Sequence, residues 1–272
     1  MALVPFPSSS VPDGYDEQRF GPEDPEGQDE PGAKMSFLEH LDELRKRLIG
    51  CAFSLLFGCA IAFIFVGKIQ EFIMLPLIAH LPSGKIIYTS GFEPFLLMMK
   101  IGALAGLMIA SPLILWQLWL FIAPGLYQHE KRFAIPFVLF STIFFLLGAA
   151  FSHYIAFPWA WAFFISWETQ YMEFLPDIKP LFSTYVKMLL AFGLVFQMPT
   201  LVFFLARMGM VTGWFLVKNT KYAILIIFIV AAVLSPGTDV VSQALMAGPM
   251  LGLYAFSIAV AYIFQKRKPA EA

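Results

Sequence analysis

The sequence predicts an all-α polytopic membrane protein, and two observations support that prediction. Hydrophobic residues make up 59% of the 272 residues and charged residues only 14%, whereas soluble domains carry about 25% charged residues. Charge-free stretches also recur at lengths that suit a spanning helix, which needs roughly 20 apolar residues. From these runs we expect six transmembrane helices, at about 48–67, 94–115, 133–157, 184–206, 219–234 and 240–264.

The two ends of the chain differ in composition from this membrane domain, which we place at 36–266. Residues 1–34 hold eight acids and six prolines against Arg19 and Lys34. Such a segment cannot bury enough apolar surface to offset its ordering entropy. It also lacks the basic and apolar regions of a secretory signal. We therefore expect residues 1–35 to form a disordered acidic cytoplasmic tail and residues 267–272 to form a short cytoplasmic tail.

A short amphipathic helix is expected to lead into the first span. Ser36 and Glu39 match the Ser-x-x-Glu capping box that starts a helix. Apolar residues then follow at spacings of four, three and four from Phe37 to Leu48, which is a helical stripe. Further along, the apolar stretch Phe72–Leu81 is too short to cross a bilayer, so we expect it to lie along the outer interface.

The third span is too long for a simple crossing. From Phe133 to Trp167 the only side chain that takes a charge near neutral pH is His153. A helix over that range would measure about 52 Å, whereas the hydrocarbon core is about 30 Å thick. The helix must therefore project beyond the membrane or break near Pro158. The fifth and sixth spans are separated only by Ser235–Asp239, whose turn residues predict a tight hairpin.

The distribution of cations predicts the orientation. Lys and Arg gather on the cytoplasmic side of short loops. Eleven of them fall on one side of the six spans and five on the other, where the loops are longer. Both termini are therefore expected in the cytoplasm. Lys100 and Lys187 lie within the second and fourth spans, and we expect them to snorkel outward.

The residues needed for catalysis or solute transport are absent from the sequence. It contains no G-x-S-x-G, H-E-x-x-H or C-x-x-C motif. The four histidines fall on different sides of the predicted membrane, so we expect no metal site, cofactor or enzymatic activity. No carboxylate lies in the middle of a span, as a proton-coupled carrier would usually require. The polar candidate there is Gln197, so a secondary transporter or channel with a site near Gln197 remains an alternative.

Five motifs together resemble one family. They are HLDELRKRL at 40–48, LPLIAHLP at 75–82, WQLWLFIAPGLYQHEKR at 116–132, FGLVFQMP at 192–199 and LSPGTDVVSQ at 234–243. Their sequence and order resemble the TatC family, the large receptor subunit of the twin-arginine protein translocase. The resemblance implies six helices in a curved, glove-like wall within the cell (inner) membrane. It also implies export of folded proteins driven by the proton-motive force, with single-span partners of the TatA and TatB types and self-association in a larger complex.

The resemblance also implies which residues bind the signal peptide. A guanidinium group is a rigid fork that suits a carboxylate bidentately, and Glu43 and Glu130 are the natural acceptors for the paired arginines. The family also places signal-peptide contacts at Arg45, Phe121 and Pro124. Two alternatives stay open. Glu43 could be only an intrahelical partner of a nearby Lys or Arg, and Glu130 could be an acid that stabilises a helix N-terminus.

Five further positions match motif residues expected to contact partners or to shape the fold: Pro76, Gln197, Pro199, Asp239 and Gln243. Many relatives carry Glu where this chain has Gln197, which can form hydrogen bonds but cannot carry a charge. Its amide could satisfy nearby backbone or meet a partner helix. Pro199 leaves the carbonyl of Val195 without its usual helical donor. Asp239 could be no more than a turn acid.

Overall fold

The computed structural model describes residues 37–79, 86–122, 134–171, 175–235, 237 and 239–265. Regular structure within these ranges is helical. The helices are α1 (Phe37–Ile64), α2 (Val66–Ile78), α3 (Glu93–Ile122), α4 (Ala134–Phe151), a π-helical turn (Ser152–Ala156), α5 (Phe157–Ile165), α6 (Ile178–Val195), α7 (Met198–Met208), α8 (Gly213–Lys218), α9 (Thr220–Leu234) and α10 (Val240–Phe264).

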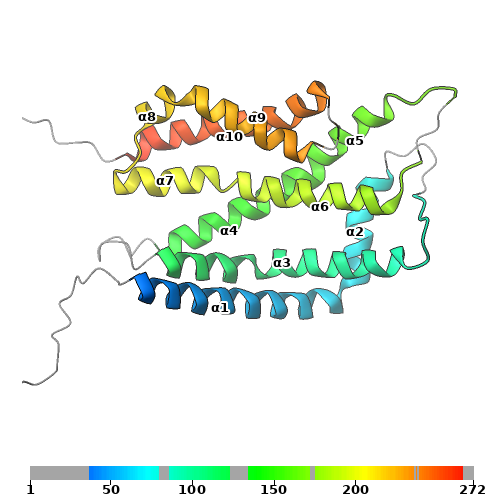
Figure 1. Cartoon of the computed structure of the whole chain (residues 1–272), viewed down its shortest axis with the longest axis horizontal. Helices are drawn as coiled ribbons and strands as arrows, with labels where there is room; N and C mark the ends of the chain where they lie inside the picture. The colour runs from blue at the N-terminus through cyan, green and yellow to red at the C-terminus, as the bar shows by residue number, and fades with distance from the viewer. Residues whose placement is uncertain are drawn as a thin grey trace, which may run out of the picture.

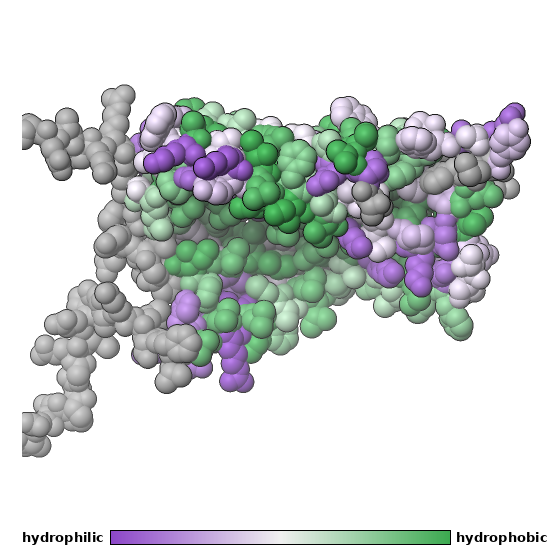
Figure 2. All heavy atoms as spheres, turned by 45° about the horizontal axis from the view of Figure 1, so that its top comes forward, coloured by the Kyte–Doolittle hydropathy of each residue, from purple (hydrophilic) through white to green (hydrophobic). Residues whose placement is uncertain are grey.

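The prediction of an all-α membrane protein is confirmed. Within the described ranges, five helical stretches are long and apolar enough to cross a membrane, and α9 is a shorter apolar helix. Figure 1 shows them running along the long axis, with α1 and α3 at one side, α8 to α10 at the other and α6 with α7 between. The space-filling view is hollowed between these two outer layers, and the visible wall of the hollow is mostly hydrophobic (Figure 2).

Several helices extend beyond the spans expected from hydropathy. The amphipathic segment before the first span belongs to the same continuous helix, α1, which ends at Ile64. Helix α3 continues to Ile122, seven residues past the expected 94–115. Helix α8, of six residues, was not expected. At its start the Thr212 hydroxyl caps the helix by accepting from the Phe215 N–H, and the Gly213 N–H donates to Oε1 of Gln265 over 3.1 Å.

The third span is a long helix that does not break at Pro158. Helix α4 passes through the π-turn directly into α5, so one apolar helical stretch covers Ile135–Ile165. The Phe157 N–H donates to the Ser152 carbonyl, five residues earlier, and Pro158 follows at the start of α5. The wider turn accommodates the missing N–H of proline. Figure 1 shows α4 and α5 running diagonally across the bundle, which lets a helix of this length fit.

The fourth span is broken in two. Helix α6 ends at Val195 and α7 begins at Met198, with Pro199 at the start of α7. The N–H of Gln197 bonds to the Leu194 carbonyl over 3.0 Å, three residues back, so the last turn of α6 is tightened. This is the place where the proline removes the donor for Val195. The break therefore follows from the residue that the sequence singled out.

Helices α1 and α3 pack unusually closely. A Cβ added to Gly58 would lie 2.3 Å from the carbonyl oxygen of Gly106, and one added to Gly106 would lie 2.5 Å from Sγ of Cys59. Small residues recur every four positions on α3, at Gly102, Gly106 and Ala110. Such spacing lets two helix backbones approach in a membrane, where packing rather than hydrophobicity drives association. The two helices therefore form one tight pair.

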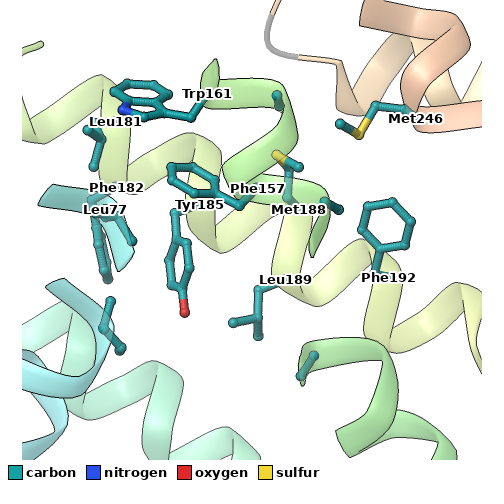
Figure 3. Packing of buried hydrophobic residues seen from close by; sticks show 14 of the residues in the cluster. Leu77, Phe157, Trp161, Leu181, Phe182, Tyr185, Met188, Leu189, Phe192 and Met246 are labelled. Atoms are coloured by element: carbon teal, nitrogen blue, oxygen red, sulfur yellow. The ribbon is translucent and has the colours of Figure 1, made fainter. Parts of the chain in front are cut away.

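The main core gathers around α6. Its buried side chains, including Phe182, Tyr185 and Phe192, pack against α2, α5 and α10 (Figure 3). Leu77 supplies the contact from α2 and Met246 that from α10. Helix α6 is thus the element on which the other helices converge.

Helix α2 closes the end of the bundle that lies opposite the start of α1. Figure 1 shows α2 running across the end of α3 rather than along it, with Ile73 and Leu77 buried. Beside it, the two loops before α3 and α6 are tied by a parallel bridge between Ile87 and Asp177. The Asp177 carboxylate also caps α6, accepting from the Lys179 N–H over 3.0 Å. This end of the molecule is therefore held by backbone pairing as well as by packing.

Candidate functional site

Glu43 lies on the first turns of α1, where its carboxylate is largely covered. Nη2 of Arg47 donates to its Oε1 over 2.8 Å, and the side chain of Glu43 is only 14% exposed. This is the i,i+4 pair that the sequence left open as an alternative. Within the described residues no hydrogen bond reaches Oε2. The second carboxylate oxygen is therefore without a hydrogen-bond donor among the described residues.

Phe121 lies at the same end of the α1–α3 pair. Its ring meets the ring of His40, with centroids 4.7 Å apart. His40 precedes Glu43 by three residues, nearly one turn of α1. The structure thus brings Glu43 and Phe121 to neighbouring turns of two packed helices. Arg45 lies on this segment too, with an exposed side chain. Glu130 and Pro124 fall outside the described residues.

Gln197 lies at the break between α6 and α7 and is bonded within the chain. Its Nε2 donates to the carbonyl of Ser141 on α4 over 2.8 Å. Two buried hydroxyls lie on these same helices, those of Ser141 and Thr200, and neither has a hydrogen-bond partner within the described part of the chain. The sequence left two roles open for the amide, a hydrogen bond to nearby backbone or a contact with a partner helix. This contact is the first of the two.

Pro199 lines an apolar recess of about 150 Å³ next to this contact. Helices α4, α7 and α10 form its walls, which consist largely of phenylalanine rings: Phe140, Phe144, Phe203, Phe256 and Phe264. The polar contact of Gln197 therefore lies beside an apolar recess that is lined by aromatic rings and contains few polar atoms. The two features occur together at the break between α6 and α7.

Asp239 is the N-cap of α10. Its carboxylate accepts from the Ser242 N–H over 2.8 Å and from the Ser242 hydroxyl. These hydrogen bonds, first that of the hydroxyl and then that of the N–H, hold the pKa of Asp239 below its ordinary value. Gln243 follows one turn later and donates from Nε2 to the Phe228 carbonyl over 2.8 Å. Gln243 thus links α10 to α9, whereas Asp239 caps α10 locally, which agrees with the turn-acid interpretation.

The candidate residues form separate groups rather than one site. Glu43 and Phe121 lie where α1 begins and α3 ends, whereas Pro76 on α2 and Asp239 at the start of α10 lie toward the opposite end (Figure 1). Gln197 lies between them along the bundle. A substrate that touched all of them would have to run the length of the protein.

Sequence reasoning missed one buried polar contact. Nδ1 of His153 and the hydroxyl of Tyr185 lie 2.9 Å apart, in the interior between the π-turn and α6. The signal was present, because a histidine within a span usually faces the bundle interior and has a partner. The partner could not be named, since it comes from another helix.

Comparison with known proteins identifies the family. The model of the family described as Sec-independent protein translocase protein (TatC) matches residues 39–249. The chain belongs to the TatC family. It is 41% identical over 239 residues to the Sec-independent protein translocase protein TatC of Desulforapulum autotrophicum, covering 88% of each chain. The corresponding protein of Koribacter versatilis is 38% identical over 245 residues, which cover 88% of this chain and 90% of that protein.

Two crystal structures of the twin-arginine translocase receptor TatC share this fold. One, determined in DDM, superimposes with a TM-score of 0.74 at 38% identity and covers 82% of this chain and 99% of that one. The other has a TM-score of 0.72 at 39% identity and covers 82% and 97%. The TatC fold thus accounts for the arrangement of helices described above, and the chain is a multi-pass membrane protein.

Proposed function

We propose that this TatC family member is the receptor for twin-arginine signal peptides and a core subunit of the translocase that exports folded proteins. Family membership and the two receptor structures support this role. We place both termini in the cytoplasm, as the distribution of Lys and Arg indicates. Single-span subunits of the TatA and TatB types are the proposed partners. The alternative of a secondary transporter or channel gains no support from the family.

The state of the Glu43 carboxylate is the observation on which the proposal rests. One of its oxygens accepts from Arg47, and the other accepts no hydrogen bond within the described residues. A guanidinium group of a signal peptide can therefore add to Oε2 without first displacing Arg47. The limited exposure of Glu43 strengthens such a contact, because a charge-assisted hydrogen bond gains as water is excluded.

Phe121 gives this carboxylate an apolar neighbour. The His40–Phe121 contact forms one wall beside Glu43, at the junction of α1 and α3. A signal peptide carries an apolar stretch after its arginines. We propose that the arginines bind at Glu43 and Glu130 while the apolar stretch passes over α3 near Phe121. Arg45 and the other basic residues around them discourage binding of unrelated cationic segments.

Peptide binding by the full-length chain in lipid nanodiscs tests the proposal. Glu43→Gln removes the charge and nearly preserves the shape. Because a hydrogen bond to a charged group is worth about 1.5–3 kcal/mol, the affinity for a twin-arginine peptide should fall about 10- to 150-fold. Glu130→Gln should lower the affinity by a factor in the same range. A peptide with Lys-Lys in place of the paired arginines should bind the unmodified chain with a similarly reduced affinity.

The matched control is Asp42→Asn, which removes the same charge from the adjacent residue. Asp42 is exposed and forms no ion pair within the described residues, so its substitution should change the affinity by less than about threefold. Equal losses of peptide affinity in Asp42→Asn and Glu43→Gln would mean that the effect comes from net charge rather than from a specific contact with Glu43. Unchanged binding in both Glu variants would refute the assigned roles.

A further inference from the structure

A second recess opens between α3 and α6, away from the residues discussed above. Its volume is about 400 Å³, and its apolar walls include Leu104, Leu107, Val186 and Leu190. It shares Lys100 and Phe182 with a smaller recess of about 150 Å³ that reaches Glu93 and Lys179 at the starts of the two helices. Together the two recesses form a groove along the α3–α6 seam, which we call the α3–α6 groove.

The charges along this groove are unbalanced. Lys100 and Lys187 line its larger part and Lys179 lies at its mouth. Two acids, Glu93 and Asp177, lie at the mouth, where both carboxylates accept from Thr89, whereas the residues that line the larger part include no acid. Neither Lys100 nor Lys187 has an ion-pair or hydrogen-bond partner within the described residues. The groove therefore presents unneutralised cations beside apolar walls.

The position of the two lysines along the helices fits the edge of a bilayer. Lys100 lies two turns below the start of α3, about 10 Å along its axis, and Lys187 lies about 13 Å below the start of α6. Both helices belong to stretches able to span a membrane. A lysine at that depth extends its ammonium group toward the headgroup level. Beyond the lysines the groove continues along Leu107 and Leu190, toward the middle of the spans.

We propose that the α3–α6 groove binds an anionic phospholipid. The phosphate lies between the ammonium groups of Lys100 and Lys187, and an acyl chain follows the apolar wall toward Leu107 and Leu190. The sequence of cation and then apolar surface matches the order of headgroup and tail in such a lipid. Basic pockets between transmembrane helices hold anionic headgroups on the cytoplasmic side of membranes; the proposed orientation places this groove on the opposite side, so its lipid comes from the outer leaflet.

Lipid titration of the purified full-length chain in detergent, followed by native mass spectrometry, tests this proposal. Phosphatidylglycerol should bind, and the double substitution Lys100→Gln with Lys187→Gln should weaken its binding about 30-fold, since each cation near an anionic headgroup contributes about fivefold. The matched control removes two cations elsewhere, by Lys68→Gln with Lys221→Gln, and should leave binding within about threefold. Phosphatidylcholine should bind weakly and with no dependence on the two lysines.

Inorganic phosphate separates a lipid site from a simple anion site. At the concentrations used for the lipid it should not displace phosphatidylglycerol, and displacement would overturn the proposal. Equal binding of both lipids, or equal losses in the two double variants, would do so too. If the groove variant does not fold, a photo-reactive phenylalanine in place of Ser183, which lines the groove, decides the matter in cell membranes. A lipid adduct supports the proposal, and a protein adduct assigns the groove to a partner helix instead.

Discussion

The hydroxyl of Tyr185 on α6 and Nδ1 of His153 in the π-turn are hydrogen-bonded over 2.9 Å in the interior of the protein. Both side chains are at most 4% exposed. Phe72 of α2 stacks on the other side of the His153 ring, with centroids 4.8 Å apart. The His153 ring thus joins three elements, α6 through the hydrogen bond and α2 through the ring stack, and its buried nitrogen would find no substitute for Tyr185.

Tyr185→Phe should destabilise the protein by about 1 kcal/mol, because it leaves the ring nitrogen of His153 buried without a partner. Thermal unfolding in detergent measures the change. Tyr262→Phe is the control, since the side chain of Tyr262 is substantially exposed and its hydroxyl should contribute little. Equal unfolding midpoints for Tyr185→Phe and the unmodified chain would contradict this prediction.

Replacing both partners should cost less than replacing one. Adding His153→Phe to Tyr185→Phe removes the orphaned nitrogen, and exchanging both members of a buried pair for apolar groups of similar shape can be nearly neutral. The double variant should therefore unfold at a higher temperature than Tyr185→Phe alone. A double variant less stable than either single variant would show that the rings matter by shape rather than by hydrogen bonding.

Gly58→Ala should weaken the α1–α3 pair. The new methyl group would lie 2.3 Å from the Gly106 carbonyl oxygen, a backbone atom that cannot turn aside. Overpacking of this kind costs about 1–3 kcal/mol. Gly252→Ala on α10 is the matched control, because nothing lies within 4 Å of its added Cβ, and it should stabilise by about 0.5–1 kcal/mol. Stability measurements that place both variants on the same side of the unmodified chain would refute the close packing.

Gln197→Leu should leave the protein folded, because the one side-chain hydrogen bond described for Gln197, to Ser141, is of a kind that averages about 0.6 kcal/mol in membranes. Gln197→Glu should also accumulate in the membrane, since a neutral carboxyl group can donate to the same carbonyl. Export and co-purification of single-span subunits then report whether Gln197 also contacts a partner.

Thr200→Val, which removes a buried hydroxyl without a described partner, should be neutral or stabilising.

Asp239 should make stability depend on pH at the acid end. Its pKa is lowered in the folded protein by the Ser242 hydroxyl and N–H. The stabilisation is therefore complete above the ordinary Asp pKa of about 3.9 and is lost as the pH falls through the lowered value. Asp239→Asn should be less stable than the unmodified chain at neutral pH and equal to it in acid. Unfolding midpoints that differ by the same amount at both pH values would exclude this linkage.

The spans followed from the sequence because the bilayer imposes a length of apolar residues that a run without charge reveals. The break before Pro199 was foreseeable for a local reason, the absent N–H. Helix α8 was not, because Gly213–Lys218 is too short to form a stable helix by itself. Besides the local cap by Thr212, it has the contact of Gly213 with Gln265, which lies 52 residues away.

The candidate site was predictable only in part. Glu43 and Phe121 lie on neighbouring turns, joined through the His40–Phe121 contact, because their motifs lie at the same side of two adjacent spans, which the alternation of spans predicts. That Arg47 rather than Lys46 would pair with Glu43 depends on rotamers that no spacing reveals. The contact of Gln197 with Ser141 joins residues 56 positions apart, so the amide could be identified as needing a partner but the partner could not be identified.

The π-turn has a consequence for changes in chain length. Its five residues close the Phe157-to-Ser152 hydrogen bond over one residue more than an α-helix uses. Each residue turns a helix by about 100°. The π-turn therefore absorbs one residue more than α-helical winding needs. Deleting one residue between Ser152 and Ala156 would restore that winding and leave Phe157 and Trp161, which stack on each other in the core, facing much as they do now. The same deletion within α4 would instead rotate α5 by about 100° and turn both rings away from the core.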